Sequence, residues 1–391
     1  MKRSTDRILV THAGSLPRPE DLIEAYRERP TADATAERLR SAVAEIVQQQ
    51  AAVGVDVVND GEFGKPMTDA VDFGAWATYV HERLSGFERR ELPNVQAVLK
   101  EVMGESKDRA DFAAFYAAAA GGVNADRRKG AYKLAVNVGP IRYTGQALVQ
   151  RDIDNFKAAL RGVRVVDAFM SAVFTGVQIG TSEHYRSKEE EAIAVAEAMR
   201  EEYAAITNAG LNVQIDDPIL VNIYEMRYSM QGDIAGFRKW AASHVELVNH
   251  ALEGIPEERI RYHLCWGSWV GPHSSDLPLR DVIDLLMKIK ASQYSFEAAN
   301  AQHEHEWKVW EGVRLPDGRA LIPGVVTHKT NVLEHPELVA DRIVRYADIV
   351  GKENVIAGTD CGFGGRMHPQ LAWAKLKALA EGAEIANRRL W

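Results

Sequence analysis

The sequence has little cysteine: only Cys265 and Cys361 occur in 391 residues. A disulfide between two isolated cysteines is not expected in a reducing cytoplasm. Both thiols stand at the end of an apolar segment and close to a glycine, since Cys265 ends the segment Arg261–Cys265 and Cys361 follows Asn354–Ala357. Buried structural cysteines would more naturally lie inside such segments. The repeated position therefore favours a site that both thiols share.

Long hydrophobic runs are also absent. Met1–Arg7 is followed only by the short apolar run Ile8–Val10, so no signal peptide is predicted. The most apolar later stretch, Val165–Gly180, contains Asp167 and is too short to span a bilayer. A net charge of −8 argues against nucleic-acid or anionic-membrane surfaces. We therefore expect a cytoplasmic protein without nucleic-acid or membrane partners, and homo-oligomer formation stays open.

The chain does have a regular alternation of apolar strands and amphipathic helices. Its 46% hydrophobic residues are sufficient for a large core. About eight strand–helix units follow one another, which is the order of a (β/α)8 TIM barrel. The predicted strands are 8–15, 55–58, 165–174, 212–215, 261–265, 293–296, 322–327 and 354–357. The predicted helices are 35–53, 187–209, 234–252, 279–290, 336–350 and one from residue 370.

Residues 66–131 interrupt this alternation. They are predicted to be helical, with an alanine-rich part at 111–120. No linker rich in proline, serine or glycine brackets them, so they are interpreted as an insertion into the barrel. An extra strand at 132–138 precedes the third barrel strand. We expect one TIM-barrel domain over residues 1–391.

His263 and Cys265 suggest a metal site. Side chains two residues apart on a strand point to the same face, so the imidazole and the thiol converge. Together they provide half of a zinc-type ligand set. Taken alone, the pair is equally compatible with a hydrogen-bonded core histidine beside a buried cysteine.

Other polar residues recur at the same place in each unit. They stand at, or just past, the carboxyl end of a predicted strand, which is the face where barrel enzymes carry their chemistry. Each has a simpler alternative: a helix cap for the carboxylates, a loop histidine, or an acid paired to a nearby Arg or Lys. Their common position favours an enzyme. The residues are Ser15, Glu62, Asp216, His263, Cys265, Glu297, His328 and Cys361.

Several short strings resemble the catalytic barrel of cobalamin-independent methionine synthases. The resemblance covers nearly the whole chain in order, and parts of it are closer to the single-barrel branch that includes epoxyalkane:coenzyme M transferases. The strings are A-G-S at 13–15, D-G-E-F at 60–63, Q-I-D-D-P at 214–218, H-L-C-W-G at 263–267, F-E-A-A-N at 296–300, V-T-H at 326–328 and T-D-C-G at 359–362.

This resemblance implies a zinc-dependent thiol alkyltransferase. It implies that Zn²⁺ is held by His263, Cys265, Glu297 and Cys361. Two thiolates, one imidazole and one carboxylate suit tetrahedral zinc, and the carboxylate is the ligand that a substrate thiol could replace. The resemblance further implies that homocysteine is bound by Ser15, Glu62 and Asp216, and that His328 assists the chemistry.

The expected reaction is methyl transfer to homocysteine, which forms methionine. Glu62 and Asp216 favour a thiol that carries an ammonium group, and the alkyl donor stays open. One alternative is epoxide opening by coenzyme M, whose sulfonate would need a cation such as Arg18 or Arg366. Others are a zinc-free barrel lyase or decarboxylase, and a structural zinc protein.

Overall fold

Eight parallel strands curve into a nearly closed barrel in the computed structural model, which describes all residues except 29–31, 67–74, 92–104, 121–132 and 175–179. Their order is β1-β11-β10-β9-β8-β7-β5-β2. The edge strands β1 and β2 lie close together: the amide of Asp56, the residue before β2, donates to the carbonyl of Val10 in β1 at 2.9 Å. The predicted TIM barrel is confirmed. The strands are β1 (Leu9–Val10), β2 (Val57–Val58), β5 (Asp167–Val173), β7 (Asn212–Asp217), β8 (Ile260–Leu264), β9 (Gln293–Phe296), β10 (Ala320–Val326) and β11 (Ile356–Thr359).

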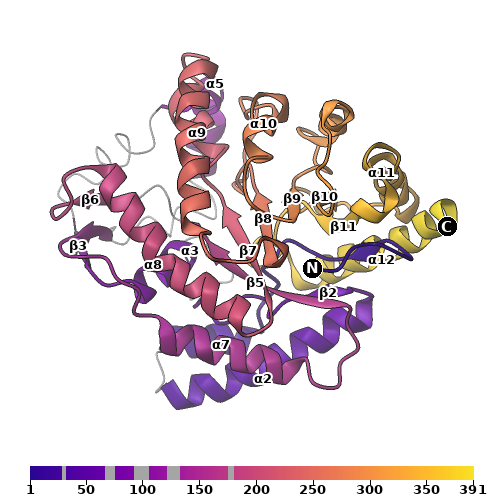
Figure 1. Cartoon of the computed structure of the whole chain (residues 1–391), viewed down its shortest axis with the longest axis horizontal. Coiled ribbons are helices and arrows are strands. Elements are labelled where there is room, and N and C mark those ends of the chain that lie inside the picture. Colours follow the sequence, from indigo (N-terminus) through magenta and orange to yellow (C-terminus); the bar gives the residue numbers. More distant parts are fainter. Residues whose placement is uncertain (29–31, 67–74, 92–104, 121–132, 175–179) are drawn as a thin grey trace.

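Helices surround the strands as an outer layer (Figure 1). Among the described residues, none of them is both long and apolar enough to cross a membrane. Capping follows the sequence: the Ser187 hydroxyl accepts from the Glu190 amide where α8 begins. The larger helices are α1 (Glu20–Glu28), α2 (Ala32–Val53), α3 (Ala75–Arg83), α7 (Gln146–Ala159), α8 (Lys188–Asn208), α9 (Ile234–Ala251), α11 (Pro336–Val350) and α12 (Pro369–Leu390).

Apolar side chains close the amino-terminal half of the barrel. Five of them, one from each of five strands, form a cluster separate from the main core. Above this cluster the buried guanidinium of Arg261 lies 4.2 Å from the centre of the Phe169 ring. Because apolar side chains fill the amino-terminal half of the barrel, its polar site residues lie at the carboxyl ends of the strands. The cluster consists of Leu9, Val57, Phe169, Ile322 and Ile356.

The predicted extra strand before the third barrel strand is present as β4 (Lys133–Asn137). It pairs with β3 (Phe87–Glu91) and with β6 (Gly180–Ser182) in a small separate sheet. The predicted all-helical insertion is thus wrong at β3, whose sequence F-E-R-R-E has no alternation of apolar and polar residues. Its other described parts include α3, α5 (Lys107–Asp111) and α6 (Ala113–Ala120). Residues 67–74, 92–104 and 121–131 of the predicted insertion lie outside the described ranges.

The predicted helix 279–290 is also wrong. Two short turns replace it, a 3-10 turn at Leu279–Asp281 and the single turn α10 at Ile283–Leu286. Val282 separates them with φ −135°, outside helical backbone.

A buried ion-pair cluster joins the insertion to the barrel helices. Arg83, the last residue of α3, contacts Asp152 of α7 at 2.6 Å and Glu202 of α8 at 3.0 Å. All three side chains are buried. The Arg83 guanidinium also lies 4.9 Å from the centre of the Tyr79 ring. Arg83 therefore joins two buried carboxylates, of which Asp152 also contacts Arg151 at 2.7 Å and Glu202 depends on Arg83.

Replacing this cation should destabilise the fold strongly. Arg83→Met leaves the buried carboxylate of Glu202 without a counter-ion among the described residues, whereas Asp152 keeps its contact with Arg151. We expect a loss of about 3–5 kcal/mol in the free energy of unfolding. Urea denaturation measures it. The matched control is Arg90→Met, because Arg90 pairs with Glu88 and Glu183 at the exposed surface of the same insertion. The control should keep the wild-type midpoint. Equal effects of the two substitutions would contradict the buried-pair argument.

Candidate metal centre

The register of strands β7, β8 and β9 aligns three polar side chains in one row across the barrel. Asp216 of β7 pairs with His263 of β8, and His263 pairs with Ser295 of β9. Residues paired in adjacent parallel strands point to the same face, so these three side chains lie side by side near the carboxyl ends of their strands. Cys265 directly follows β8 and Cys361 follows β11 by two residues.

His263, Cys265 and Cys361 form a buried triad. One ligand atom from each lies within 4.8 Å of the other two. The sulfurs are 3.6 Å apart, too far for a disulfide bond, and two sulfurs on a tetrahedral zinc at about 2.3 Å would lie about 3.8 Å apart. Nδ1 of His263 is 3.1 Å from the Ser295 hydroxyl, while Nε2 has no hydrogen-bond partner among the described residues. The donor set fits a metal ion.

The surroundings of the triad favour thiolate. A hydrogen bond from Cys265 and the nearby Arg366 guanidinium lower the pKa of Cys361 well below its usual value, although burial opposes this. The Ser268 hydroxyl lies 3.4 Å from the same sulfur. For Cys265, the shared hydrogen bond and burial raise the pKa. Without a metal, one proton is therefore shared between the two sulfurs, as in other tightly coupled pairs.

Glu297 directly follows β9 and is buried beside the triad, but it does not belong to the close group of three. Its Oε1 accepts from the Trp266 amide at 2.9 Å, and its Oε2 accepts from Asn300 at 2.8 Å. The ammonium of Lys329 lies 3.0 Å from the same Oε2. Burial opposes the negative charge, yet Lys329 and His328 keep the pKa of Glu297 below its usual value. The carboxylate is ionised.

His328 follows β10 by two residues and is buried. Neither ring nitrogen has a hydrogen-bond partner in the described part of the chain. Burial lowers the pKa of His328 to about 4, although the charges of Cys361 and Glu297 act in the opposite direction. The imidazole is therefore neutral at pH 7 and can accept a proton.

Glu62 and Asp216 are two buried carboxylates with one unpartnered oxygen each in the described structure. The other oxygen of Glu62 is 3.1 Å from the Lys65 ammonium, and that of Asp216 accepts from Gln214 at 2.6 Å. Burial and the nearby Glu62 charge raise the pKa of Asp216. A cationic group bound between the two carboxylates would offset this repulsion.

The turn after β2 holds Glu62 in an unusual backbone conformation. Its φ is 61°, in the left-handed region that non-glycine residues rarely adopt. Two side-chain hydrogen bonds support the turn: Oδ1 of Asn59 accepts from the Gly61 amide, and the Asp60 carboxylate accepts from the Glu62 amide. The strain indicates that the direction of the Glu62 side chain is imposed by the surrounding fold.

Ser15 lies against the turn that follows Cys361. Its carbonyl accepts from the amides of Phe363 at 2.8 Å and Gly364 at 2.9 Å. A Cβ at Gly364 would come within 2.2 Å of the Ser15 hydroxyl, so the close approach requires glycine there. The structure therefore places all eight residues predicted from the sequence at one end of the barrel.

A cavity of about 320 Å³ opens at the triad, a size suited to a molecule as small as an amino acid. Trp269 forms part of its wall, stacks on His273 with 4.0 Å between ring centres, and donates its indole N–H to the Tyr116 hydroxyl of α6 at 3.1 Å. The sequence reading missed Trp269, Ser295 and Lys329. The described lining residues are Asp216, Asp217, Pro218, His263, Cys265, Gly267, Ser268, Trp269, Cys361 and Arg366.

Comparison with known proteins agrees with this site. The catalytic-domain profile of the cobalamin-independent synthases matches residues 94–385. The chain belongs to this family. The family is one of methyltransferase enzymes, and the buried triad of His263, Cys265 and Cys361 is consistent with a metal site.

Two curated relatives and one solved structure illustrate the range of this family. The 2-hydroxypropyl-CoM lyase of Xanthobacter autotrophicus is 26% identical over 247 residues. The match covers 56% of this chain and 61% of the lyase, which is less than two thirds of the lyase's length. The methionine synthase of Thermococcus kodakarensis is 23% identical over 398 positions, covering 96% of this chain and 93% of that protein. A B12-independent methionine synthase from Shewanella sp. W3-18-1, in complex with selenomethionine, has the same fold, with a TM-score of 0.71, 21% identity and coverage of 98% and 99%.

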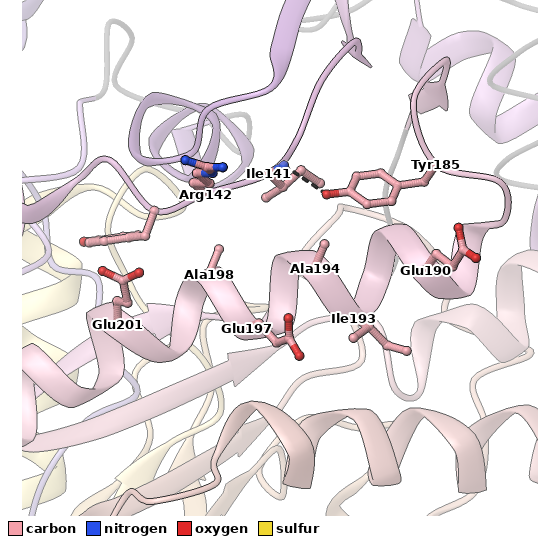
Figure 2. Close-up of a pocket in the computed structure, with 10 residues that line it drawn as sticks. Ile141, Arg142, Tyr185, Glu190, Ile193, Ala194, Glu197, Ala198 and Glu201 are labelled. Atoms are coloured by element: carbon pink, nitrogen blue, oxygen red, sulfur yellow. Dashed lines mark hydrogen bonds between the residues drawn. The ribbon is translucent and has the colours of Figure 1, made fainter.

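A larger cleft of about 660 Å³ lies outside the barrel, between α8 and the segment after β4 (Figure 2). Tyr185 crosses it, and its hydroxyl accepts from the Ile141 amide at 3.0 Å. Three glutamates and several aliphatic side chains line it, but no cysteine or histidine does so among the described residues. The group of possible metal ligands found among the described residues lies instead at the smaller cavity at the strand ends.

A histidine–carboxylate network supports the loop that begins at Cys265. The His303 ring packs on Trp266, with 4.2 Å between ring centres, and lies between Asp276 at 3.1 Å and Glu306 at 2.9 Å. Burial opposes protonation, but the two carboxylates outweigh it and raise the pKa of His303 from 6.5 to about 9. At neutral pH this buried imidazole is a cation.

The His303 cation should make stability depend on pH. Because the folded pKa of about 9 exceeds the unfolded value of 6.5, its contribution is complete below pH 6.5 and is lost as pH rises through 9. The upper bound is about 3 kcal/mol. In urea unfolding between pH 6 and 10, the free energy of unfolding should fall as pH rises. The slope of this fall should be smaller in His303→Gln than in the wild type. His305→Gln, at an exposed histidine of the same segment, should keep the wild-type slope. Parallel slopes for all three proteins would refute the assignment.

Proposed function

We propose that the chain is a zinc-dependent S-alkyltransferase of the cytoplasm, which most simply transfers a methyl group to homocysteine and forms methionine. The observation that carries the proposal is Nε2 of His263, which has no hydrogen-bond partner among the described residues and is buried beside two sulfurs at the ends of barrel strands. Family membership supports the reaction class.

Zinc would be held by His263, Cys265 and Cys361, with Glu297 as the fourth, exchangeable ligand. Bound zinc would keep the substrate sulfur as thiolate, the nucleophilic form. A free thiol with a pKa of about 8.5 is roughly 3% ionised at pH 7. Complete ionisation would therefore contribute at most about 30-fold, or roughly 2 kcal/mol. The remaining acceleration would come from alignment of the two substrates and from proton transfer.

His328 would carry the proton of the reaction. Its imidazole is neutral and unpartnered near the Cys361 and Glu297 charges. It can accept the proton that the substrate thiol releases on ionising. The S–C bond then forms as the bond between the methyl group and its donor breaks, and the protonated His328 gives its proton to the leaving atom.

Glu62 and Asp216 would bind the ammonium group of the substrate, with Ser15 nearby for the rest of its amino-acid part. Each carboxylate has one oxygen without a partner in the described structure. Two buried acids that repel each other are a poor site for a neutral or anionic group and a good one for a cation. This arrangement favours homocysteine as the thiol.

Epoxide opening by coenzyme M is the second candidate. Two observations favour it: the similarity to a 2-hydroxypropyl-CoM lyase, and Arg366 in the cavity wall, where a guanidinium could bind a sulfonate. The Glu62 and Asp216 pair weighs against it, since coenzyme M has no ammonium group for the two carboxylates to bind.

Cys361→Ser should abolish the metal site. We expect the purified wild-type protein to contain about one zinc per chain, and the variant to lose most of the zinc and all thiol-transfer activity, because serine does not replace a thiolate ligand. Metal analysis after dialysis measures this. The control is Ser268→Ala, since Ser268 touches the same sulfur without belonging to the proposed ligand set. A Cys361→Ser protein with full zinc and activity would exclude the ligand assignment.

Asp216→Asn should weaken binding of the amino thiol alone. Losing a charged partner for the ammonium should raise the homocysteine dissociation constant about 10- to 100-fold. The thiolate–metal absorption of the cobalt-substituted protein reports binding during titration. 3-Mercaptopropionate, which lacks the ammonium, should bind wild type and variant equally. A response of the wild type to coenzyme M and not to homocysteine would instead select the second candidate.

A further inference from the structure

We propose that Lys329 is a positioning residue that competes with the metal for Glu297 and holds this carboxylate when a substrate thiol takes its place. The inference rests on the proposed function and adds to it a residue outside the ligand set. Lys329 immediately follows His328 on the loop after β10.

Glu297 has two hydrogen-bond donors and one ion-pair partner in the described structure. The two donors are neutral and fixed by the fold, the Trp266 amide on Oε1 and the Asn300 side chain on Oε2. The ion-pair partner is the Lys329 ammonium, 3.0 Å from Oε2. Both oxygens of Glu297 therefore have partners without a metal, whereas Nε2 of His263 has none among the described residues.

The two ends of this ion pair differ in exposure. The Glu297 side chain is 0% exposed and that of Lys329 is 17% exposed, so the lysine enters from the mouth of the barrel. Its loop is anchored, since the Lys329 amide donates to the Thr327 hydroxyl at 3.1 Å. A fixed cation thus reaches the carboxylate from the side where substrate would arrive.

A buried carboxylate that leaves a metal needs another counter-ion. Without one, its negative charge would be buried away from water with no partner of opposite sign, which is strongly unfavourable. Lys329 offers that counter-ion. In the position that the carboxylate occupies beside Lys329, Trp266 and Asn300 also donate hydrogen bonds to it. The same cation withdraws electron density from Glu297 and makes it a weaker ligand. Lys329 should therefore lower metal affinity and raise thiol affinity at once.

Lys329→Met tests these opposite effects, with Lys329→Arg as the charge-preserving control. Zinc affinity is measured by competition with a chromogenic chelator, and thiol affinity by titration of the cobalt-substituted protein with homocysteine. We expect Lys329→Met to bind zinc about tenfold more tightly and homocysteine about tenfold more weakly, a size typical of residues that support metal ligands. Lys329→Arg should retain both wild-type values. Zinc should also raise the melting temperature more in the methionine variant.

The direction of the zinc effect separates this role from simple support. If Lys329 only held Glu297 in place for the metal, its loss would weaken zinc binding, and that result would overturn the proposal. Unchanged zinc and thiol affinities in Lys329→Met would also overturn it. Failure of the proposed function looks different, because wild-type protein would then bind no zinc, or its cobalt spectrum would not respond to any thiol.

Discussion

The hydrogen-bonded register of β7, β8 and β9 is the constraint on which the site depends. It fixes Asp216, His263 and Ser295 as neighbours in one row, so the histidine is oriented by a hydroxyl on one side and faces a carboxylate on the other. A shift by one residue would turn all three side chains to the opposite face of the sheet. The loops then need only to add Cys265, Glu297 and Cys361 within one or two residues of a strand end.

Burial determines the chemistry of these groups. The apolar cluster below the site excludes water, which makes each unpartnered polar atom costly and each charge dependent on a neighbour. The unpartnered atoms of His263, His328, Glu62 and Asp216 gather at one end of the barrel, whereas the ion pairs around Arg83 are complete. A buried polar atom without a partner costs free energy, and a ligand that pairs with it recovers that cost.

The local sequence was sufficient to predict the barrel and the polar residues at the carboxyl ends of its strands. Each of these residues lies at the end of an apolar run whose length and composition are typical of a buried strand. It was not sufficient where long-range geometry decides. Strand β3 pairs through its backbone with β4 and has no apolar pattern of its own. The pairing of Ser295 with His263 follows from register, and the choice of Lys329 as partner of Glu297 follows from how two loops meet. Neither of these two contacts can be predicted from the spacing of residues along the sequence.

The contact between Trp269 and Tyr116 links the cavity to a segment about 150 residues earlier in the chain. Asp108 of the same segment binds the amide and hydroxyl of Ser274, so the insertion holds the cavity loop at two points. During divergence, the two segments would have to change together. An exchange of this loop between relatives, made to transplant substrate preference, would have to carry the matching part of the insertion with it.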